Sequence, residues 1–412
     1  MKRRFKFLWT MALAINLCTA CRNHVEQVDY VTSEREHTLL IYMAGDNTLS
    51  RYVENNLYAI GQGIRASEKP LNVVIYRDNL TAANDLPVLY QLKRRAHSER
   101  VDTIFLKRWK EDIDSTDPET IAEVVRLTFS RFDSEVKGME IWSHALSWIP
   151  SDSWTADGDA DTRATQYVGI DGKASCELWE FRKALANSGV KLNYMTFDAC
   201  HMATAEVAYE LREVSDYLLA APTEIMGEGF PYKQMIASLS TIRDRETLLA
   251  GLTAAYEDFR TSYADNGTFS LLRTAGFEAL RDACVELASQ SAATLALWRE
   301  NPSANEIKLQ RYGRKVSTKA TEMGARYYFY DLLDWAEKLG EESEMTANAD
   351  AVAEALKECV VESYHSQRFE ASGGGFDIKR CCGVAMSVPE FWSLAKKGNL
   401  DAAYGQLGWQ IP

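Results

Sequence analysis

From about residue 38 to residue 221, short apolar runs alternate with longer stretches in which apolar residues recur every three or four positions. The first pattern is typical of a buried β-strand, and the second is typical of a helix that buries one face. The predicted strands are 38–44, 71–76, 88–92, 101–106, 139–143, 192–197 and 217–221. Such strands, alternating with helices, predict a mainly parallel sheet that is covered by helices on both faces.

Helices are predicted between these strands. One follows the turn Gly45-Asp46-Asn47, and another begins at Asp117-Pro118, because aspartate is a frequent N-cap and proline is favoured at the first helical position. A third is predicted over 176–186, and a fourth directly after residue 200. The segment 150–165 is polar and rich in turn residues, so we expect a surface loop there.

The rest of the chain has a different pattern. Apolar residues recur with helical spacing in 248–259, 276–298, 327–339 and 351–364, so 245–370 is predicted to be largely helical. The apolar run 382–388 is expected to be a late strand that returns to the main sheet. The predicted organisation is a signal peptide at 1–20, a linker at 21–37, an α/β core at 38–242 and a helical C-terminal region at 243–412, with its late strand at about 381–389.

The N-terminal segment has the pattern of an export signal. Four of the first six residues are basic, and the apolar run 7–17 that follows is too short to span a membrane. Small residues precede Cys21, which resembles the cleavage box of bacterial lipoproteins, in which the cysteine is lipidated. We therefore predict a lipid anchor at Cys21 in the bacterial cell envelope. A plain secretory signal that is cut nearby is the alternative.

Composition and charge narrow the range of partners. The chain is 46% hydrophobic and 11% aromatic, which is typical of a globular protein, and its formal net charge is −13. Phosphate binding requires a basic face, so nucleic acid is not expected as a partner, whereas a basic substrate fits the acidic balance. The eight cysteines and six histidines lack the spacing of a zinc site, and no metal site is predicted from them.

His144 and Cys200 each follow the end of a predicted strand. They are 56 positions apart (200 − 144), and ligands of parallel sheets bind at the carboxyl ends of strands. A cysteine nucleophile needs a thiolate, an imidazole and donors for the oxyanion. The helix predicted after Cys200 would favour the thiolate, His144 would serve as acid and base, and the backbone N–H groups of Ala145 and Cys200 would bind the oxyanion.

The pattern alone leaves a structural interpretation open. A cysteine at a strand end is often a small buried apolar residue, and a histidine near a tryptophan is often structural.

Several segments resemble one known family. Asp198-Ala199-Cys200-His201-Met202, followed by the helix with Val207-Ala208-Tyr209-Glu210-Leu211, resembles the nucleophile segment of the clostripain-type cysteine peptidases. The segments 42–47, 139–148, 221–232 and 382–389 are similar to other parts of that family, so that the likeness runs from about 38 to 390. The resemblance implies a caspase- and gingipain-like α/β/α sandwich with a mainly parallel sheet and, here, a largely helical C-terminal addition.

The resemblance also implies roles for individual residues. By position, Cys200 is the nucleophile, His144 is the general acid and base, and Asp198 lines the S1 pocket, where it favours a basic P1 side chain. Glu228 is expected to be a second acidic wall of that pocket. A carboxylate can pair with a guanidinium through two hydrogen bonds, which suits arginine at P1, and lysine is also expected there. The alternative for Asp198 is an N-cap of the following helix. The implied partners are protein or peptide substrates, and the chain is expected to be a monomer.

The sequence departs from the family pattern after the histidine. The family has glycine directly after the histidine and again before the tryptophan, whereas this chain has Ala145 and Ser147. Glycine permits a positive φ and a close backbone approach. The loss of both leaves an alternative open, namely a weak or inactive surface lipoprotein that uses the same fold for binding. The basic run 311–319 would suit docking, although a solvated helix face explains it equally.

The loop at 150–165 lies where some family members cut themselves during maturation. Arg163 is its only basic residue, so the bond after Arg163 is the predicted cleavage site, with Lys173 as the second choice and an uncut loop as the alternative. Acidic residues alternate at 157, 159 and 161, as at the start of a calcium loop, but Val168 stands where an EF-hand needs glutamate. No cofactor is expected to be required. Calcium dependence is a hypothesis that the resemblance to clostripain allows.

Overall fold

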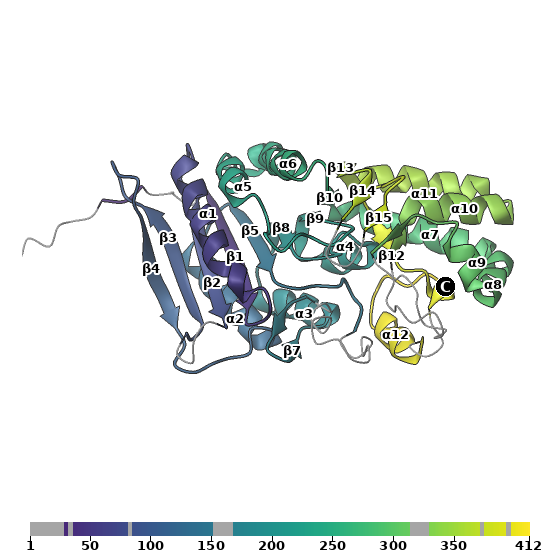
Figure 1. Ribbon diagram of the computed structural model, residues 1–412, viewed down its shortest axis with the longest axis horizontal. Helices are drawn as coiled ribbons and strands as arrows, with labels where there is room; N and C mark the ends of the chain where they lie inside the picture. The colour runs from purple at the N-terminus through teal and green to yellow at the C-terminus, as the bar shows by residue number, and fades with distance from the viewer. Residues whose placement is uncertain are drawn as a thin grey trace, which may run out of the picture.

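The computed structural model describes residues 29–31, 36–80, 85–150, 168–313, 329–370, 375–392 and 397–412. A nine-stranded sheet runs through the centre in the order β13-β10-β9-β8-β5-β1-β2-β3-β4 (Figure 1). Its strands are β1 (His37–Gly45), β2 (Asn72–Asn79), β3 (Val88–Arg94), β4 (Val101–Arg108), β5 (Val136–Trp142), β8 (Leu192–Asp198), β9 (Ser215–Ala220), β10 (Thr268–Arg273) and β13 (Val360–His365). All seven strands predicted from the first half of the chain are present.

The five central strands, β9, β8, β5, β1 and β2, are parallel to one another. β3 and β4 extend the sheet antiparallel at one edge, and β10 and β13 do so at the other. Every residue of β1 and of β8 is buried, as expected for parallel strands that are covered on both faces. The predicted mainly parallel sheet is confirmed.

Helices cover the two faces of the sheet, which gives an α/β/α sandwich (Figure 1). α1 (Val53–Ala66), preceded by the 3-10 turn η1 (Ser50–Tyr52), lies on one face with α5 (Tyr232–Leu239) and α6 (Arg245–Ser262). α2 (Pro118–Arg131), α3 (Leu178–Ser188) and α4 (Ala205–Leu211) lie on the other. The predicted start of α2 is confirmed, because the Asp117 side chain accepts hydrogen bonds from the N–H groups of Glu119 and Thr120.

The C-terminal half is less helical than its pattern predicts, because it supplies two strands of the main sheet. β10 is a six-residue run between helices, and β13 begins at Val360, inside the predicted helix 351–364. The main sheet therefore extends across the predicted boundary between 242 and 243. The helices of this half are α7 (Phe277–Gln290), α8 (Ala292–Glu300), α9 (Pro302–Glu306), α10 (Leu332–Ser343), α11 (Thr346–Cys359) and α12 (Lys397–Tyr404), with the 3-10 turns η4 (Thr274–Gly276) and η5 (Pro389–Phe391).

The late strand does not return to the main sheet, and that expectation is wrong. β16 (Ala385–Met386) joins β11 (Arg311–Tyr312) and β12 (Phe329–Asp331) in a separate three-stranded sheet. β4 and β13 already occupy the two edges of the main sheet. Ala385 instead forms an isolated parallel bridge with Thr204, directly before α4. Two short hairpins complete the fold: β6 (Ile170–Asp171) with β7 (Ala174–Ser175), and β14 (Arg368–Phe369) with β15 (Phe376–Asp377).

Within the described part of the chain, no helix combines the length and the apolar character needed to cross a membrane.

Candidate active site

The predicted nucleophile and the predicted base follow neighbouring strands. β5 and β8 are adjacent and parallel, and Trp142 pairs with Asp198 in their register. His144 lies two residues beyond Trp142, and Cys200 lies two residues beyond Asp198. Because neighbouring strands are about 4.8 Å apart, this register brings both residues to the same level beyond the carboxyl edge of the sheet.

The His144 ring is half-buried and is held by the loop that follows β1. Its Nε2 lies 2.8 Å from the Thr48 hydroxyl oxygen. Burial lowers the pKa of His144 to about 4. The imidazole is therefore neutral around pH 7, and a neutral imidazole has one nitrogen that accepts a proton. A hydrogen bond from Nε2–H to Thr48 would leave Nδ1 as that acceptor.

The Cys200 thiol is half-buried and lies beside the backbone of Ile225. The Ile225 N–H donates to Sγ at 3.4 Å, and Sγ lies 3.8 Å from the Ile225 carbonyl oxygen. The helix expected directly after Cys200 begins only at Ala205, with Thr204 as its N-cap. His201 has a φ of +57° and turns the chain away from a helical path, so the predicted effect of a helix N-terminus on the thiolate is not supported.

The Ala145 N–H points away from the hairpin that follows the histidine loop. The carbonyl of His144 accepts from Gly169 N–H at 3.1 Å. The C=O and N–H groups of one trans peptide point in opposite directions, so the Ala145 N–H points away from Gly169. Ile170 and Gly172 of this hairpin are hydrogen-bonded to the turn after β1. The hairpin therefore holds the orientation of the peptide between His144 and Ala145.

Of the two positions where the family has glycine, only one has a backbone that favours it. Ser147 has a φ of +58°, in the left-handed region that glycine adopts most readily, whereas Ala145 does not have a positive φ. The Ser147 hydroxyl is hydrogen-bonded to the Thr204 hydroxyl at 2.6 Å. The chain therefore keeps the glycine-like conformation with a serine that is tied to the start of α4.

The histidine loop is anchored by the C-terminal end of the chain, which the sequence did not indicate. Trp148 is completely buried, and its Nε1–H donates to the Ser387 hydroxyl at 2.9 Å. Its ring centre lies 5.1 Å from that of Tyr404 and 5.5 Å from that of Trp392. The residues after β16 thus hold the loop that carries His144.

Asp198 is the last residue of β8 and is 6% exposed. Its Oδ2 accepts hydrogen bonds from Phe230 N–H at 3.0 Å and from the Tyr232 hydroxyl at 2.8 Å. Burial raises the pKa of Asp198 to about 7, and the two hydrogen bonds act in the opposite direction. The alternative role as an N-cap is excluded, because Thr204 caps α4.

The loop that carries Glu228 passes close to Asp198. Gly229 has a φ of +78°, and a Cβ atom at this position would lie 2.5 Å from Asp198 Oδ2. Glycine is therefore needed for the close approach. The Glu228 side chain is exposed to solvent, and its charge, like that of Asp198, raises the pKa of nearby Tyr263, where burial is the larger cause. The structure thus brings the two predicted S1 carboxylates into one neighbourhood.

A further carboxyl group behind Asp198 was missed in the sequence. Glu140 lies inside β5, is 1% exposed, and its Oε1 lies 2.5 Å from the Tyr232 hydroxyl oxygen. Burial, with a smaller effect from the charge of Asp198, raises the pKa of Glu140 to about 8. The available signal was a glutamate in an otherwise apolar strand, Met-Glu-Ile-Trp.

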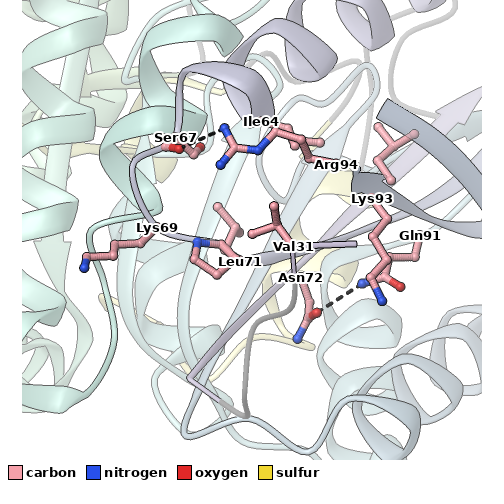
Figure 2. A pocket seen from close by; sticks show the side chains of 11 residues that line it. Val31, Ile64, Ser67, Lys69, Leu71, Asn72, Gln91, Lys93 and Arg94 are labelled. Carbon is pink, nitrogen blue, oxygen red and sulfur yellow. Dashed lines mark hydrogen bonds between the residues drawn. The ribbon is translucent and has the colours of Figure 1, made fainter. Parts of the chain in front are cut away.

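A small pocket lies at the opposite end of the sheet (Figure 2). Its lining includes Asn72, which begins β2, and Lys93 and Arg94 at the end of antiparallel β3. The Arg94 side chain donates to the carbonyls of Arg65 and Ser67 at the end of α1. The pocket is therefore distinct from the site beyond β5 and β8.

Other predicted positions lie outside the described residues, namely Cys21, Arg163 and the acidic residues 157, 159 and 161. Lys173 is exposed at the turn between β6 and β7. Within the ranges that the structure describes, no group of three or more histidine, cysteine or acidic side chains is arranged to hold a metal ion.

The family model of the clostripain family matches residues 41–382. This match spans most of the chain, and the chain therefore belongs to the clostripain family. It is a clostripain-like cysteine peptidase, a hydrolase, with protein or peptide substrates. A search of curated proteins finds no match.

Solved structures with the same fold include proteases from Bacteroides and Parabacteroides. The secreted C11 cysteine protease iotapain from Bacteroides thetaiotaomicron has a TM-score of 0.70 and 22% identity, with 91% of this chain and 99% of that chain covered. An inactive zymogen C11 protease from Parabacteroides distasonis has a TM-score of 0.69 and 23% identity, with 92% and 98% covered. At these identities the likeness establishes the fold.

Proposed function

We propose that this peptidase is an endopeptidase that cleaves after arginine and lysine through a dyad of Cys200 and His144. The observation that carries the proposal is the register of β5 and β8, in which Trp142 faces Asp198. It supports a site in which thiol, imidazole and a specificity carboxylate meet beyond two adjacent strands.

In the proposed mechanism, neutral His144 accepts the thiol proton and Cys200 Sγ attacks the scissile carbonyl carbon. The oxyanion is bound by the backbone N–H groups of Ala145 and Cys200. The protonated imidazole then gives its proton to the leaving amine, which leaves an acyl-enzyme that water hydrolyses. With its pKa lowered, the protonated ring is a strong acid toward the leaving amine, whereas the neutral ring is a weaker base toward the thiol.

The preference for a basic P1 residue is assigned to Asp198, with Glu228 as an outer acidic wall. Asp198 is only 6% exposed and lies against the loop that carries Gly229. A guanidinium or ammonium group entering there would gain a charge-assisted hydrogen bond and would lower the pKa of the buried carboxyl. The ionised form of Asp198 is therefore stabilised when a basic P1 side chain is bound.

Export, anchoring and maturation complete the proposal. The export signal and a lipid on Cys21 would place the enzyme at the bacterial cell envelope, and one similar protein is described as secreted. Cleavage after Arg163 is proposed to activate the enzyme, and a similar structure described as an inactive zymogen supports a step of this kind. Calcium binding and a monomeric state stay predictions.

The experiment compares the mature chain with its Cys200→Ala and His144→Ala variants on fluorogenic peptides that carry Arg, Lys, Leu or Asp at P1. Cys381→Ala is the matched control, because this thiol is also half-buried but lies near Asp331, away from β8. We expect hydrolysis of the Arg and Lys peptides, loss of activity in the first two variants and full activity in the control.

Absence of hydrolysis, with and without calcium and after deliberate cleavage at Arg163, would instead support the binding lipoprotein. The same samples would be treated with an alkylating reagent near neutral pH. Rapid labelling of Cys200 that depends on His144 indicates an activated thiol, and slow labelling of both Cys200 and Cys381 indicates that neither is activated.

A further inference from the structure

A tyrosine hydroxyl lies between two buried carboxyl groups behind the proposed S1 pocket. Tyr232 Oη is 2.5 Å from Glu140 Oε1 and 2.8 Å from Asp198 Oδ2. Glu140 and Tyr232 are each 1% exposed. The three side chains come from β5, α5 and β8, and they meet between the sheet and the helical layer formed by α1, α5 and α6.

The Tyr232 hydroxyl has a single proton, and this restricts the charge that Glu140 and Asp198 can carry together. One hydroxyl can donate its proton to only one acceptor at a time. If Glu140 and Asp198 were both ionised, one of the two contacts would bring oxygen atoms together without a proton between them, in surroundings where two carboxylates repel strongly. One of the two carboxyl groups must therefore hold a proton.

The donors around each carboxyl indicate which one holds it. Asp198 Oδ2 also accepts from the Phe230 N–H, and a backbone N–H can only donate, so this contact favours the ionised form of Asp198. The second oxygen of Glu140 faces the Thr196 hydroxyl at 3.2 Å, and a hydroxyl can rotate and accept. All contacts are satisfied when Glu140 donates to Tyr232 and Tyr232 donates to Asp198.

The other titratable groups nearby do not alter this distribution. Burial raises the pKa of Tyr194 on β8 and of Tyr263 after α6. The charge of Glu140 raises the pKa of Tyr194 further, and the charges of Asp198 and Glu228 raise that of Tyr263, so both phenols stay neutral. Among the described residues, no lysine or arginine forms an ion pair with Glu140 or Asp198. The pKa of Glu140, about 8, and that of Asp198, about 7, follow the same order.

We infer that Glu140 and Tyr232 are positioning residues of the S1 pocket, and that a protonated Glu140 acts through the Tyr232 hydroxyl to keep Asp198 ionised and fixed for a basic P1 side chain. The inference rests on the function proposed above for Asp198. The protonation of Glu140 is independent of that function and can be measured without any substrate.

Infrared difference spectroscopy of the full mature chain tests the location of the proton. The spectrum of the wild type minus that of Glu140→Gln near pH 7 is expected to contain the carbonyl stretch of a protonated carboxylic acid. Glutamine preserves the shape and can still donate to Tyr232 through its amide. A difference spectrum without this band overturns the inference, whether or not the protein cleaves peptides.

Kinetics test the consequence for specificity, measured as the ratio of kcat/KM for a P1 arginine peptide to that for the matching leucine peptide. For Tyr232→Phe we expect this ratio to fall about tenfold or more, because the carboxylate loses a charge-assisted hydrogen bond. The ratio should fall mainly because KM for the arginine peptide rises. The effect should become smaller at higher pH, where Asp198 is ionised in the variant as well. Tyr256→Phe is the matched control, since this buried tyrosine of α6 has no described contact with either carboxyl group, and its ratio should stay unchanged.

Glu140→Gln is the conservative variant, because its amide can still donate to Tyr232 and Tyr232 can still donate to Asp198, so the ratio is expected to stay within about threefold of the wild type. A rise of about tenfold or more would mean that Asp198 holds the proton in the wild type, and it would overturn the inference. The difference spectrum could contain the band as expected while the wild type has no preference for basic P1 residues. In that case the proposed function of Asp198 is wrong and the S1 role of Glu140 and Tyr232 falls with it, while the buried proton is confirmed.

Discussion

Trp142 on β5 pairs directly with Asp198 on β8, and this pairing sets the position of His144 relative to Cys200. His144 lies two positions after Trp142, and Cys200 lies two positions after Asp198. The side chains of His144 and Cys200 therefore leave the sheet at one level. A slip of one residue in this register would turn alternate side chains to the opposite face. The geometry of the proposed dyad therefore depends on the features that fix the register of these two strands.

One such feature is Gly138, which pairs with Tyr194 in the same ladder. A Cβ atom on Gly138 would lie 2.1 Å from Cζ of the Tyr194 ring, and that ring is completely buried. We expect Gly138→Ala to lower the free energy of unfolding by roughly 2–4 kcal/mol, because the ring has no space to move into. Urea unfolding in a Cys200→Ala background measures this change.

Gly61→Ala in α1 is the matched control. Nothing lies within 4 Å of the added Cβ atom, and the residue is inside a helix. It should stabilise the protein by about 0.5–1 kcal/mol, because alanine loses less backbone entropy than glycine. Equal effects of the two substitutions would show that the Tyr194 ring does not restrict position 138.

Thr48 is expected to orient the His144 ring. Thr48→Val removes the hydroxyl group that lies 2.8 Å from Nε2, and we expect kcat/KM to fall by roughly tenfold, with the ring less firmly held in one tautomer. Thr48→Ser keeps the hydroxyl and should retain most of the activity. The pH dependence of kcat/KM should also change at its acidic limb, which reports the ionisation of His144. An unchanged profile in Thr48→Val would exclude an orienting role.

Ser147 and Ala145 allow the effect of the missing glycines to be separated. Ser147→Gly relieves a positive φ but loses the hydrogen bond to Thr204, so the free energy of unfolding should change by less than ~1 kcal/mol. Ser147→Val places a β-branched residue at a positive φ and should lower it by ~2 kcal/mol or more. Urea unfolding measures both effects.

Ala145→Gly addresses the other position. The backbone there does not have a positive φ, so glycine relieves no strain and should lower the free energy of unfolding by about 0.5–1 kcal/mol. Because the direction of its N–H is fixed by the bond between His144 and Gly169, kcat/KM should stay within about threefold. A large gain in activity would mean that Ala145 displaces the oxyanion donor.

The sequence predicts the central sheet well because its parallel strands are long, continuous apolar runs such as β1 and β8. It fails for β10 and β13, since these six-residue strands are surrounded by helical periodicity. An apolar segment of six residues has the same pattern in a strand and in a buried helix. What distinguishes a strand here is pairing, of β10 with β9 and of β13 with β10, and local periodicity does not record such contacts between distant segments.

The candidate site was predictable where the chemistry lies at the ends of strands, as for His144 and Cys200. The partners of those residues were not predictable, because they come from distant segments. Tyr232 reaches Asp198 from α5, and Ser387 reaches Trp148 from beyond β16. No spacing in the sequence encodes these contacts, which depend on how the helices and the C-terminal segment pack on the sheet.

Glu206 on α4 should make the stability of the protein depend on pH. It is completely buried, its Oε1 accepts from Ser387 N–H at 2.8 Å, and its Oε2 has no hydrogen-bond partner among the described residues. Burial raises its pKa from 4.5 to about 7. A carboxyl whose pKa is higher in the folded state binds its proton more tightly there, so its contribution is complete below about pH 4.5 and is lost as the pH rises to about 7.

Glu206→Gln removes this ionisation while preserving the acceptor for Ser387. Measured by urea unfolding in the Cys200→Ala background, the variant should match its parent near pH 5 and exceed it by ~1–3 kcal/mol near pH 8. Glu210→Gln is the matched control on the same helix, because that buried carboxylate is paired with Arg182 at 3.2 Å and accepts from Gly408 N–H. It should destabilise the protein at both pH values, since Arg182 loses its partner. Parallel pH profiles for Glu206→Gln and its parent would mean that Glu206 is ionised in the folded protein, with a cation or ordered water compensating its charge.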